Sequence, residues 1–481
     1  MRHEHLINPP SVTNAISAAA LIATGAVTMY SSGCATERED EAGERPNIIV
    51  IMADDLGYGD LGGYFGGEAE TPHLNRLAQE GMLFTDFHSS GVWCSPTRAS
   101  LLTGRYPQRV GIDKDGLDVD IADWDSHYGI ARADLNEITM AGYLKQAGYA
   151  TAAFGKWHLG FDLTANPVNH GFDEFRGLLA GCGDFFSKID RFGNRDWWHN
   201  DQLEFQEGYV TDVITDNAIN FMKEKRDKPF FIYMAHLAPH FPWQTSEDGD
   251  LETRREGEDF TSNEPGPGSK LSPHPMEKIP EVVQQMVEEL DDNIGRLVEA
   301  IRELGLDHNT LVFFTSDNGN YIHYHNIWPE VGCNGPLRGQ KAQVWEGGHR
   351  VPGIAWWPGH IPALSVTNET AASFDLLPTF LNILGIEAPP EGSANVLDGV
   401  SILPVLTKGE TLEPRALLWA RHQFRAVRKG EWKLVSEKGE EPELYNLFFD
   451  IGEELNVADK YPEIIKQLEE ELADLEERLS N

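Results

Sequence analysis

The sequence predicts an α/β protein built on a large, mostly parallel sheet with helices on both faces. Several short runs of apolar, β-rich residues are continuous rather than alternating, which is typical of strands covered on both faces. Helical patterns separate these runs, and strands that alternate with helices indicate a parallel sheet. A length of 481 residues, of which 41% are hydrophobic, is enough for a large buried core.

Four apolar runs form the predicted centre of the sheet, at 47–53, 149–154, 229–235 and 311–315. Polar residues follow each run, and in sheets of this kind the site lies beyond the carboxyl ends of the strands. We therefore expect these polar residues to share one site. In chain order they are Asp54 and Asp55, Lys156 and His158, His236 and His240, and Asp317 and Asn318.

Helices are predicted between the strands at 74–81, 135–148, 282–304 and 374–384. The second closes on a glycine, as a helix C-terminus often does, and the third is long and amphipathic. After Pro404 the pattern changes to short strands typical of an antiparallel sheet, at 417–420, 424–428, 432–435 and 444–447, followed by an amphipathic helix at 461–479. The chain is thus predicted to consist of a large domain at 45–413 and a small α+β subdomain at 414–481.

The chain is strongly acidic, with 39 Lys+Arg against 77 Asp+Glu and a net charge of −38. This balance argues against nucleic-acid binding, which requires a basic face, and against attraction to an anionic membrane. A highly solvated surface is the simplest interpretation. An anionic substrate would then need positive charge concentrated at its binding site.

The N-terminal residues 1–34 are typical of a signal peptide. The apolar run 15–30 is too short for a transmembrane helix, and the small residues before Cys34 resemble a bacterial lipoprotein cleavage site. Ser31 stands where a larger apolar residue is usual, so a lipid anchor at Cys34 and ordinary signal cleavage both remain open. The sequence predicts export, to the periplasm or to the outer membrane or cell surface, with the acidic stretch 37–44 as a tether.

Four cysteines without a CxxC pair do not form a disulfide scaffold, and they argue against structural zinc. For Cys182 and Cys333, separate thiols and a disulfide bond both remain open.

One segment, which begins Cys94-Ser95-Pro96-Thr97-Arg98 and runs to Pro107, is the most specific motif of the chain. It closely resembles the signature of the type I sulfatases, members of the alkaline phosphatase-like superfamily. The resemblance implies that a maturation enzyme oxidises Cys94 to formylglycine, and that Arg98 holds the modified residue. A thiol is poorly suited to sulfuryl transfer, whereas an aldehyde hydrate offers one hydroxyl to attack sulfur and a second to expel the sulfate. The implied activity is hydrolysis of sulfate esters through a covalent sulfate intermediate on residue 94.

Two pairs of oxygen ligands, Asp54-Asp55 and Asp317-Asn318, stand at separate strand ends. Carboxylates together with an amide oxygen suit a hard cation such as Ca²⁺ or Mg²⁺. The resemblance assigns all four residues to one Ca²⁺, with the modified residue 94 as a further ligand. The ion would polarise the nucleophile and offset the charge of the sulfate.

Lys156 and His158 stand two residues apart, and in an extended segment both would point to one side. Their segment, Gly-Lys-Trp-His-Leu-Gly, matches the sulfatases. The resemblance implies that Lys156 binds sulfate and steadies residue 94, and that His158 is the base that drives sulfate elimination.

The resemblance also places His240 and Lys341 on the sulfate oxygens, with one or both helping to protonate the departing alcohol. His236 is an alternative to His240, which we favour because Ala238-Pro239-His240 matches the family more closely. These cations would form the local positive pocket that an acidic protein needs for an anionic substrate. The resemblance continues through Glu346–Pro352, expected to shape a loop, and through the C-terminal subdomain, so that 45–413 would be the catalytic domain.

Two other functions remain as alternatives: a phosphate-ester hydrolase of the same superfamily, and a non-catalytic carbohydrate-binding protein on the same scaffold. Within the sulfatase interpretation, export favours a sulfated oligosaccharide or polysaccharide as the substrate, with exo attack preferred to endo. Candidate specificity loops are 113–128, 183–200 and 321–334. In the second of these, Trp197-Trp198-His199 is suited either to stacking on a sugar or to a buried structural role.

Overall fold

A computed structural model of the chain describes residues 45–112, 137–161, 163–249, 251, 253–258, 272–323 and 330–480. The signal peptide at 1–34, the lipid anchor at Cys34, the tether at 37–44 and the loop 113–128 are predictions that lie outside the described residues. No helix in the described part of the chain is both long enough and apolar enough to span a membrane.

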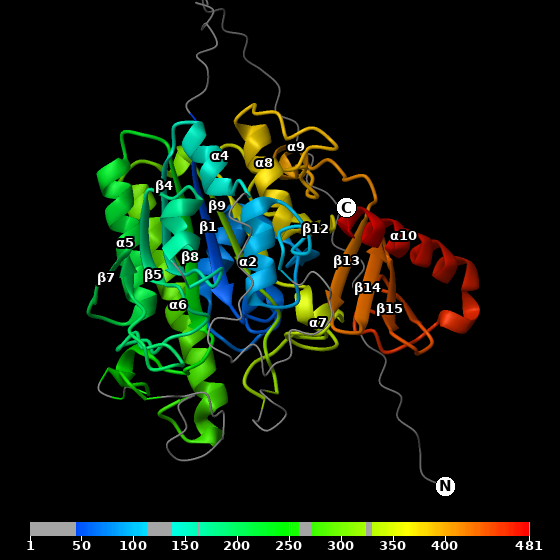
Figure 1. Cartoon of the computed structure of the whole chain (residues 1–481), viewed down its shortest axis with the longest axis horizontal. Coiled ribbons are helices and arrows are strands. Elements are labelled where there is room, and N and C mark those ends of the chain that lie inside the picture. The colour runs from blue at the N-terminus through cyan, green and yellow to red at the C-terminus, as the bar shows by residue number, and fades with distance from the viewer. Residues whose placement is uncertain are drawn as a thin grey trace, which may run out of the picture. The chain divides into compact units, whose positions relative to one another are not determined.

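A ten-stranded mixed sheet runs through the protein (Figure 1). Its central strands are parallel, and antiparallel partners stand on either side of them. The predicted α/β class with a mostly parallel sheet is therefore confirmed. In spatial order the strands are β11 (Ser365–Thr367), β2 (Met82–Phe84), β10 (Gly353–Trp356), β9 (Thr310–Ser316), β1 (Asn47–Asp54), β8 (Phe230–Pro239), β4 (Ala150–Lys156), β5 (Glu174–Leu178), β6 (Trp198–His199) and β7 (Gln202–Leu203).

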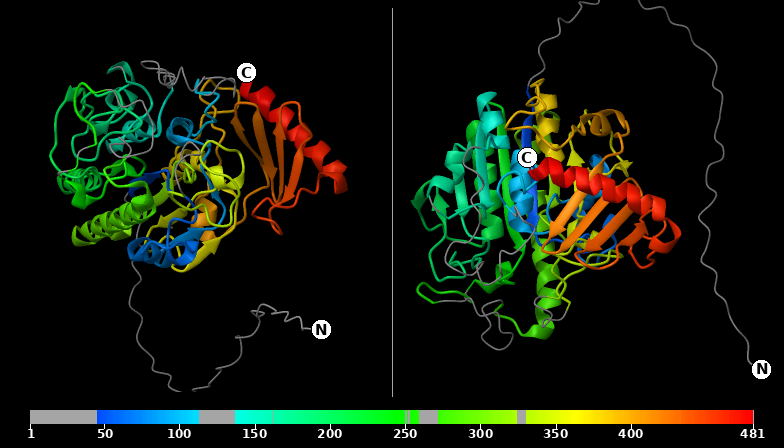
Figure 2. Two further views of the ribbon diagram at one scale, coloured as in Figure 1. Left: turned by 90° about the horizontal axis from the view of Figure 1, so that it is seen from below. Right: turned by 45° about the vertical axis from the view of Figure 1, so that its right-hand side comes forward.

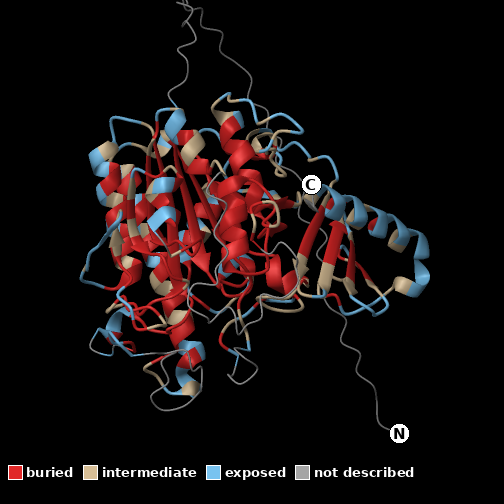
Figure 3. Cartoon of the chain, in the orientation of Figure 1, coloured by how far each residue is buried: buried red, intermediate tan, exposed pale blue. Residues whose placement is uncertain are grey.

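The four predicted runs form adjacent strands, β9, β1, β8 and β4. Strand β1 shows why they are apolar throughout. Ile49 and Ile51 pack into one hydrophobic core, whereas Ile48 and Val50 pack into a second core on the opposite face. Both faces of the sheet are thus covered, which the strands' buried colour in Figure 3 also shows.

Two layers of helices supply this cover. The first core contains buried residues of α1 (Pro72–Glu80), α5 (Val210–Lys225) and α6 (Ile279–Glu303). The second contains those of α2 (Cys94–Thr103), α4 (Met140–Gln146), α8 (Leu376–Ile383) and α9 (Leu403–Lys408). Helices α1, α4, α6 and α8 correspond to the predicted helices, whereas α2, α5 and α9 were not predicted.

A four-stranded antiparallel sheet follows, as predicted, with strands β13 (Ala416–Arg421), β14 (Phe424–Lys429), β15 (Trp432–Glu437) and β16 (Glu443–Asn446) in sequence order. Helix α10 (Pro462–Ser480) packs along this sheet (Figure 2). It buries Leu468 and Leu475. A separate pair of short strands joins β3 (Phe87–His88) to β12 (Ala371–Ala372). Because Arg45–Asn481 form one compact unit by their contacts, the domain boundary near residue 413 stays a prediction.

Buried ion pairs connect the small sheet to the rest of the unit. Arg428 of β14 binds Asp86 at 2.6 Å, and Lys433 of β15 binds Glu346 at 2.9 Å. Glu346 begins a short helix, α7 (Glu346–His349), so the segment expected to shape a loop is helical and carries a structural charge. Its Gly347 and Gly348 lie against the segment 338–343 and against Gly319, where any added Cβ would collide with backbone atoms.

Candidate active site

The carboxyl ends of β1 and β9 lie side by side and deliver the acidic residues. The strands pair in parallel with Ala53 opposite Ser316, so Asp54 and Asp317 emerge together. The backbone of Asp55 turns into the left-handed region, with φ of 63°, and its amide donates to Asp317 Oδ1 at 3.1 Å. A positive φ is rare for residues other than glycine and indicates a position held by its surroundings.

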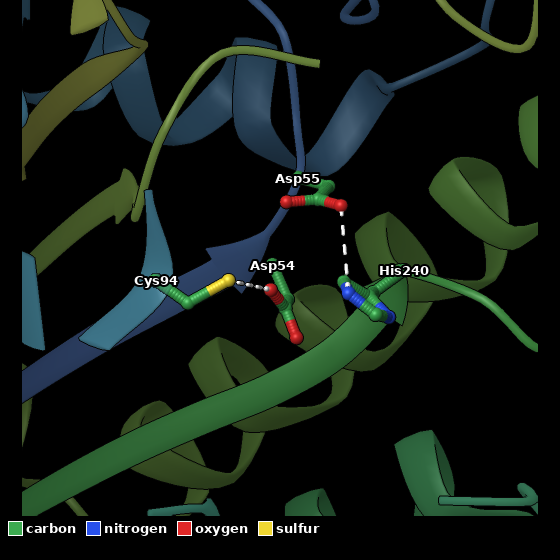
Figure 4. A group of neighbouring side chains, drawn as sticks. All are labelled: Asp54, Asp55, Cys94 and His240. Carbon is green, nitrogen blue, oxygen red and sulfur yellow. Dashed lines mark hydrogen bonds and ion pairs between the residues drawn. The ribbon is translucent and has the colours of Figure 1, made fainter. Parts of the chain in front are cut away.

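Cys94 lies at the first position of α2 and is 1% exposed. Its thiol donates to Asp54 Oδ1 at 3.4 Å, and Lys341 Nζ donates to Cys94 Sγ at 3.3 Å. Figure 4 shows the sulfur directed at Asp54, with Asp55 and His240 close by. Burial, reinforced by the nearby charge of Asp317, raises the pKa of the Cys94 thiol. An unmodified Cys94 is therefore protonated and a weak nucleophile.

Arg98 stands one turn further along α2, fully buried. Its Nε and Nη2 donate to Asp317 Oδ2 at 3.1 and 2.7 Å, and Nη1 donates to the Lys156 carbonyl at 3.2 Å. Burial would raise the pKa of Asp317, but the Arg98 charge, with those of Lys156 and Lys341, outweighs it and gives a pKa of about 2. Arg98 thus holds the end of β9 against the helix that begins at Cys94.

Two lysines neutralise the acidic residues from opposite sides. Lys156, at the end of β4, places Nζ 2.7 Å from Asp54 Oδ2, and Lys341 places Nζ 2.6 Å from Asp55 Oδ1. Burial nevertheless dominates at Asp54 and raises its pKa to about 7, against the opposing charge of Lys156. The pair of acids and the pair of lysines form a compact charged centre around Cys94.

The donor set fits a hard cation. Among the described residues, the buried Asn318 Oδ1 has no hydrogen-bond partner, while Asn318 Nδ2 donates to Asp55 Oδ1 at 2.8 Å. An orphaned amide oxygen beside carboxylates is the kind of ligand that Ca²⁺ prefers. Ligand atoms of Asp54, Asp55, Cys94 and His240 lie within 4.8 Å of one another. The four predicted metal ligands at the ends of β1 and β9 are therefore brought together.

The structure distinguishes the two histidines of β8. His240 Nε2 lies 3.6 Å from Asp55 Oδ2, and its Nδ1 donates to the Phe241 carbonyl at 2.7 Å. His236 is fully buried, and neither ring nitrogen has a hydrogen-bond partner in the described part of the chain. The geometry thus places His240, and not His236, in the charged centre.

His158 reaches the site by a different route from the one expected. Strand β4 ends at Lys156, and His158 has φ of 59°, so the extended segment predicted to align the two side chains does not exist. Hydrogen bonds from the amides of Trp157 and His158 to the Leu178 and Leu179 carbonyls, at 2.8 and 3.1 Å, fix the turn. Burial first, then the charge of Lys156, holds the pKa of His158 well below its usual value. The imidazole is therefore neutral and able to accept a proton.

Two further residues belong to this environment, and the sequence analysis did not single them out. The Tyr233 hydroxyl lies 3.4 Å from Arg98 Nη1. Arg191 contributes positive charge to the surroundings of His158. Arg191 falls within the loop 183–200 proposed for specificity, whereas Tyr233, inside an apolar strand, carries no sequence signal of its own.

Cys182 and Cys333 are both free thiols, so the disulfide alternative is not supported. Cys182 is buried and Cys333 is exposed. Of the three candidate specificity loops, 183–200 is fully described, and 321–334 is described in part.

A mixed sheet whose parallel centre delivers acidic and basic residues to one edge, with a small C-terminal antiparallel sheet, defines a hydrolase of the alkaline phosphatase-like superfamily. The sulfatase family model matches residues 46–386, and the model "N-sulphoglucosamine sulphohydrolase, C-terminal" matches residues 340–478. The chain belongs to the sulfatase family and is a sulfuric ester hydrolase.

The chain is similar to sulfatases over most of its length. N-acetylgalactosamine-6-sulfatase of Rattus norvegicus is 34% identical over 408 residues, covering 82% of this chain and 71% of the relative. Arylsulfatase A of Bos taurus is 32% identical over 501 residues, covering 89% and 88%. The crystal structure of Ps i-CgsB in complex with k-i-k-neocarrahexaose superposes with a TM-score of 0.75 at 28% identity, covering 90% of this chain and 93% of that one.

Proposed function

We propose that this protein removes sulfate from a sulfated oligosaccharide or polysaccharide, using Ca²⁺ and a formylglycine made from Cys94. The observation that carries the proposal is the position of Cys94, buried between Asp54 and Lys341 in a centre that also contains the orphaned Asn318 Oδ1. A buried, protonated thiol has no evident hydrolytic role there, whereas an oxygen nucleophile at the same position would lie among cation ligands and sulfate-binding cations.

Asp54, Asp55, Asp317 and Asn318 would hold the Ca²⁺, with residue 94 completing the set. The bound ion supplies positive charge that offsets the negative charge of the sulfate. The oxidised residue supplies the hydroxyl that attacks sulfur, as a thiol does not.

The remaining roles belong to side chains of the site. Lys156 and Lys341 bind sulfate oxygens through their ammonium groups. Arg98 holds residue 94 in place, because it anchors the first turns of α2 to Asp317. His158 is neutral because its pKa is lowered, and it accepts the proton when sulfate leaves residue 94. His240 lies opposite Asp55, where it contacts the sulfate and the departing alcohol oxygen.

The carbohydrate part of the proposal rests on the relatives. The matched proteins include N-acetylgalactosamine-6-sulfatases, and one structural neighbour is in complex with k-i-k-neocarrahexaose. An exported enzyme meets sulfated glycans outside the cytoplasm, which agrees with the signal peptide predicted at 1–34. Export to the periplasm or cell surface is part of this proposal.

The test is mass spectrometry of the Cys94 peptide from protein produced with a formylglycine-generating enzyme, combined with turnover assays. We expect the thiol to be replaced by an aldehyde, and aryl sulfate to be hydrolysed in preference to phosphate monoesters and diesters. An unmodified Cys94 in the presence of a competent maturation enzyme would contradict the proposal. Faster turnover of a phosphoester would favour the phosphoesterase alternative.

A further inference from the structure

A cavity of about 540 Å³ is lined in part by the loop 183–200, one of the candidate specificity loops. Its lining comes from four segments that are separate in sequence, 187–189, 195–197, 203–205 and 254–256. The third of these includes Leu203 at the end of β7. No residue assigned above to catalysis, to sulfate or to Ca²⁺ lines it.

The cavity is connected to His158 through the segment 179–181. Asp196 lines the cavity and accepts hydrogen bonds from the Leu179 and Ala180 amides at 3.1 and 2.7 Å. The Leu179 carbonyl in turn accepts from the His158 amide at 3.1 Å. Gly181 packs directly on the imidazole, since a Cβ at this position would lie 2.4 Å from His158 Nε2. The segment 179–181 thus contacts both a lining residue of the cavity and the active-site histidine.

Arg254, which lines the cavity, is 1% exposed, yet it has no ion-pair partner among the described residues. The contacts of its guanidinium are with the Cys182 sulfur, at 3.5 Å from Nη1 and 3.6 Å from Nη2, and its Nε has no acceptor. Burying an arginine charge without an anion is costly, and a thiol is a weak acceptor. In a protein of net charge −38, a buried cation without a carboxylate indicates an anionic ligand.

The lining segment 203–205 has the character of a carbohydrate-binding face. Phe205 is 62% exposed and Leu203 is 49% exposed, so both present apolar surface to solvent. Lys188 lies beneath, with Nζ 5.3 Å from the centre of the Phe205 ring. Exposed aromatic rings stack on the apolar faces of sugars. Arg255 is a further exposed cation in the lining. Trp197 also lines the cavity but is 3% exposed. Of the two roles open for it from the sequence, stacking on a sugar or a buried structural role, this burial favours the structural one.

We infer that this cavity binds the sugar unit next to the one being desulfated, and that Arg254 attracts an anionic substituent on that unit. The inference rests on the proposed function and adds the class of substrate: an oligosaccharide with a second acidic group beside the scissile sulfate ester. Sulfate and the carboxylate of a uronic acid share this chemistry. Their planar or tetrahedral oxygen sets both suit a guanidinium.

The test compares two substrates on the matured full-length enzyme. One is a disaccharide with sulfate on both sugar units, and the other is 4-nitrophenyl sulfate, which has no second unit. In Arg254→Met we expect the ratio of kcat/KM for the disaccharide to kcat/KM for the aryl sulfate to fall about tenfold, the loss of one charge-assisted hydrogen bond. Arg478→Met, which removes an exposed positive charge from α10, should leave the ratio unchanged. Disaccharides with a uronic acid, or with no acid, on the second unit distinguish the two anions.

Because Arg254 is buried, its variant can lose stability, so a thermal unfolding measurement accompanies the assay. Phe205→Ala provides a second variant, at an exposed residue of the cavity lining. An unchanged ratio in Phe205→Ala and in any folded Arg254→Met would overturn the inference. If the matured enzyme hydrolyses neither substrate, the proposed function fails instead. In that case the doubly sulfated disaccharide and the disaccharide with no acid on the second unit are titrated into Cys94→Ala. The inference requires tighter binding of the doubly sulfated one, and equal binding would overturn it.

Discussion

The thiol of Cys94 is surrounded by groups that suit a different atom. Asp54 accepts from it, Lys341 donates to it, and burial keeps it protonated. Such an environment is adapted to an oxygen nucleophile beside a cation rather than to thiol chemistry. These contacts support the proposal that the side chain at position 94 is modified after synthesis.

Replacing this side chain should abolish turnover while leaving the fold intact. In Cys94→Ala we expect kcat for aryl sulfate to fall by at least about a thousandfold, as for other lost nucleophiles. The free energy of unfolding should change by less than about 1.5 kcal/mol, because only one buried atom is removed. Kinetic assays and denaturant unfolding measure the two quantities. Cys333→Ala, at an exposed thiol, is the matched control, and retained activity in Cys94→Ala would contradict the mechanism.

In the proposed mechanism, Asp317 connects the Ca²⁺ site to Arg98, because its carboxylate is both a Ca²⁺ ligand and the ion-pair partner of Arg98. Asp317→Asn removes the negative charge that pairs with Arg98, and it replaces a proposed carboxylate ligand of Ca²⁺ with a weaker amide ligand at the same time. We expect Ca²⁺ affinity to fall by at least about tenfold, and the rate to fall with it. Calorimetric titration of Ca²⁺ and the Ca²⁺-dependent rise in Tm measure affinity without requiring activity.

Chelation should also lower the Tm of the unmutated protein, since an ion bound only by the folded state stabilises it. Asp459→Asn, on the exposed surface, should behave as wild type in both measurements. A Ca²⁺ affinity that is equal in Asp317→Asn and wild type would exclude Asp317 as a ligand.

At the scale of elements, the site depends on where strands and helices end. Strands β1 and β9 stop together, and β4 ends at the lysine that binds Asp54. Helix α2 begins at Cys94, and its next turn returns to the end of β9 through Arg98. The small C-terminal sheet takes part indirectly, since Lys433 binds the helix α7 that packs against the Lys341 segment.

The pair formed by Asp86 and Arg428, which joins the region of β3 to β14, should make stability depend on pH. Burial alone would raise the pKa of Asp86, but the Arg428 and Arg350 charges outweigh it and hold the pKa well below its ordinary value of 3.8. A depressed pKa in the folded state stabilises the protein above the unfolded pKa. This contribution is lost as the pH falls below about 4 toward the folded value.

Asp86→Asn should therefore be less stable than wild type by about 3 kcal/mol at pH 7, because it leaves Arg428 buried without its partner. The difference should shrink when unfolding is measured in acid, at about pH 3. Asp474→Asn on exposed α10 should show no such pH-dependent difference. If the free energies of unfolding of wild type and Asp86→Asn differed by the same amount at every pH, the assigned pKa shift of Asp86 would be contradicted.

At the scale of the whole molecule, a net charge of −38 opposes the approach of a polyanionic substrate. The cations of the site act at short range, whereas the repulsion is long-ranged and is screened by salt. We expect kcat/KM for a sulfated polysaccharide to rise with ionic strength between about 0.02 and 0.2 M, where the Debye length shortens from roughly 20 Å to below 10 Å. For singly charged 4-nitrophenyl sulfate the change should be much smaller.

The measurement is initial rate against NaCl concentration at a fixed, saturating Ca²⁺ concentration. A fall in kcat/KM for the polymer with added salt would indicate that local attraction dominates, and would contradict the expectation.

Much of the architecture could be predicted because its signal is local. The apolar runs at β1, β4, β8 and β9 are continuous, since both faces of each strand are buried, and their polar ends carry the site residues. Helix α2 was missed because its residues are all buried and lack the one-sided apolar pattern that reveals a surface helix. The turn at His158 was also missed, since a left-handed histidine leaves no mark in composition.

By itself the sequence determined the family, the sheet and the identity of the charged residues, because motif spacing and apolar periodicity are properties of contiguous segments. Only the tertiary structure decided between His236 and His240, since both follow the same strand and differ in what faces them. It alone showed that Arg254 is buried without an ion-pair partner among the described residues, because packing brings Arg254 against Cys182, 72 positions away in the chain.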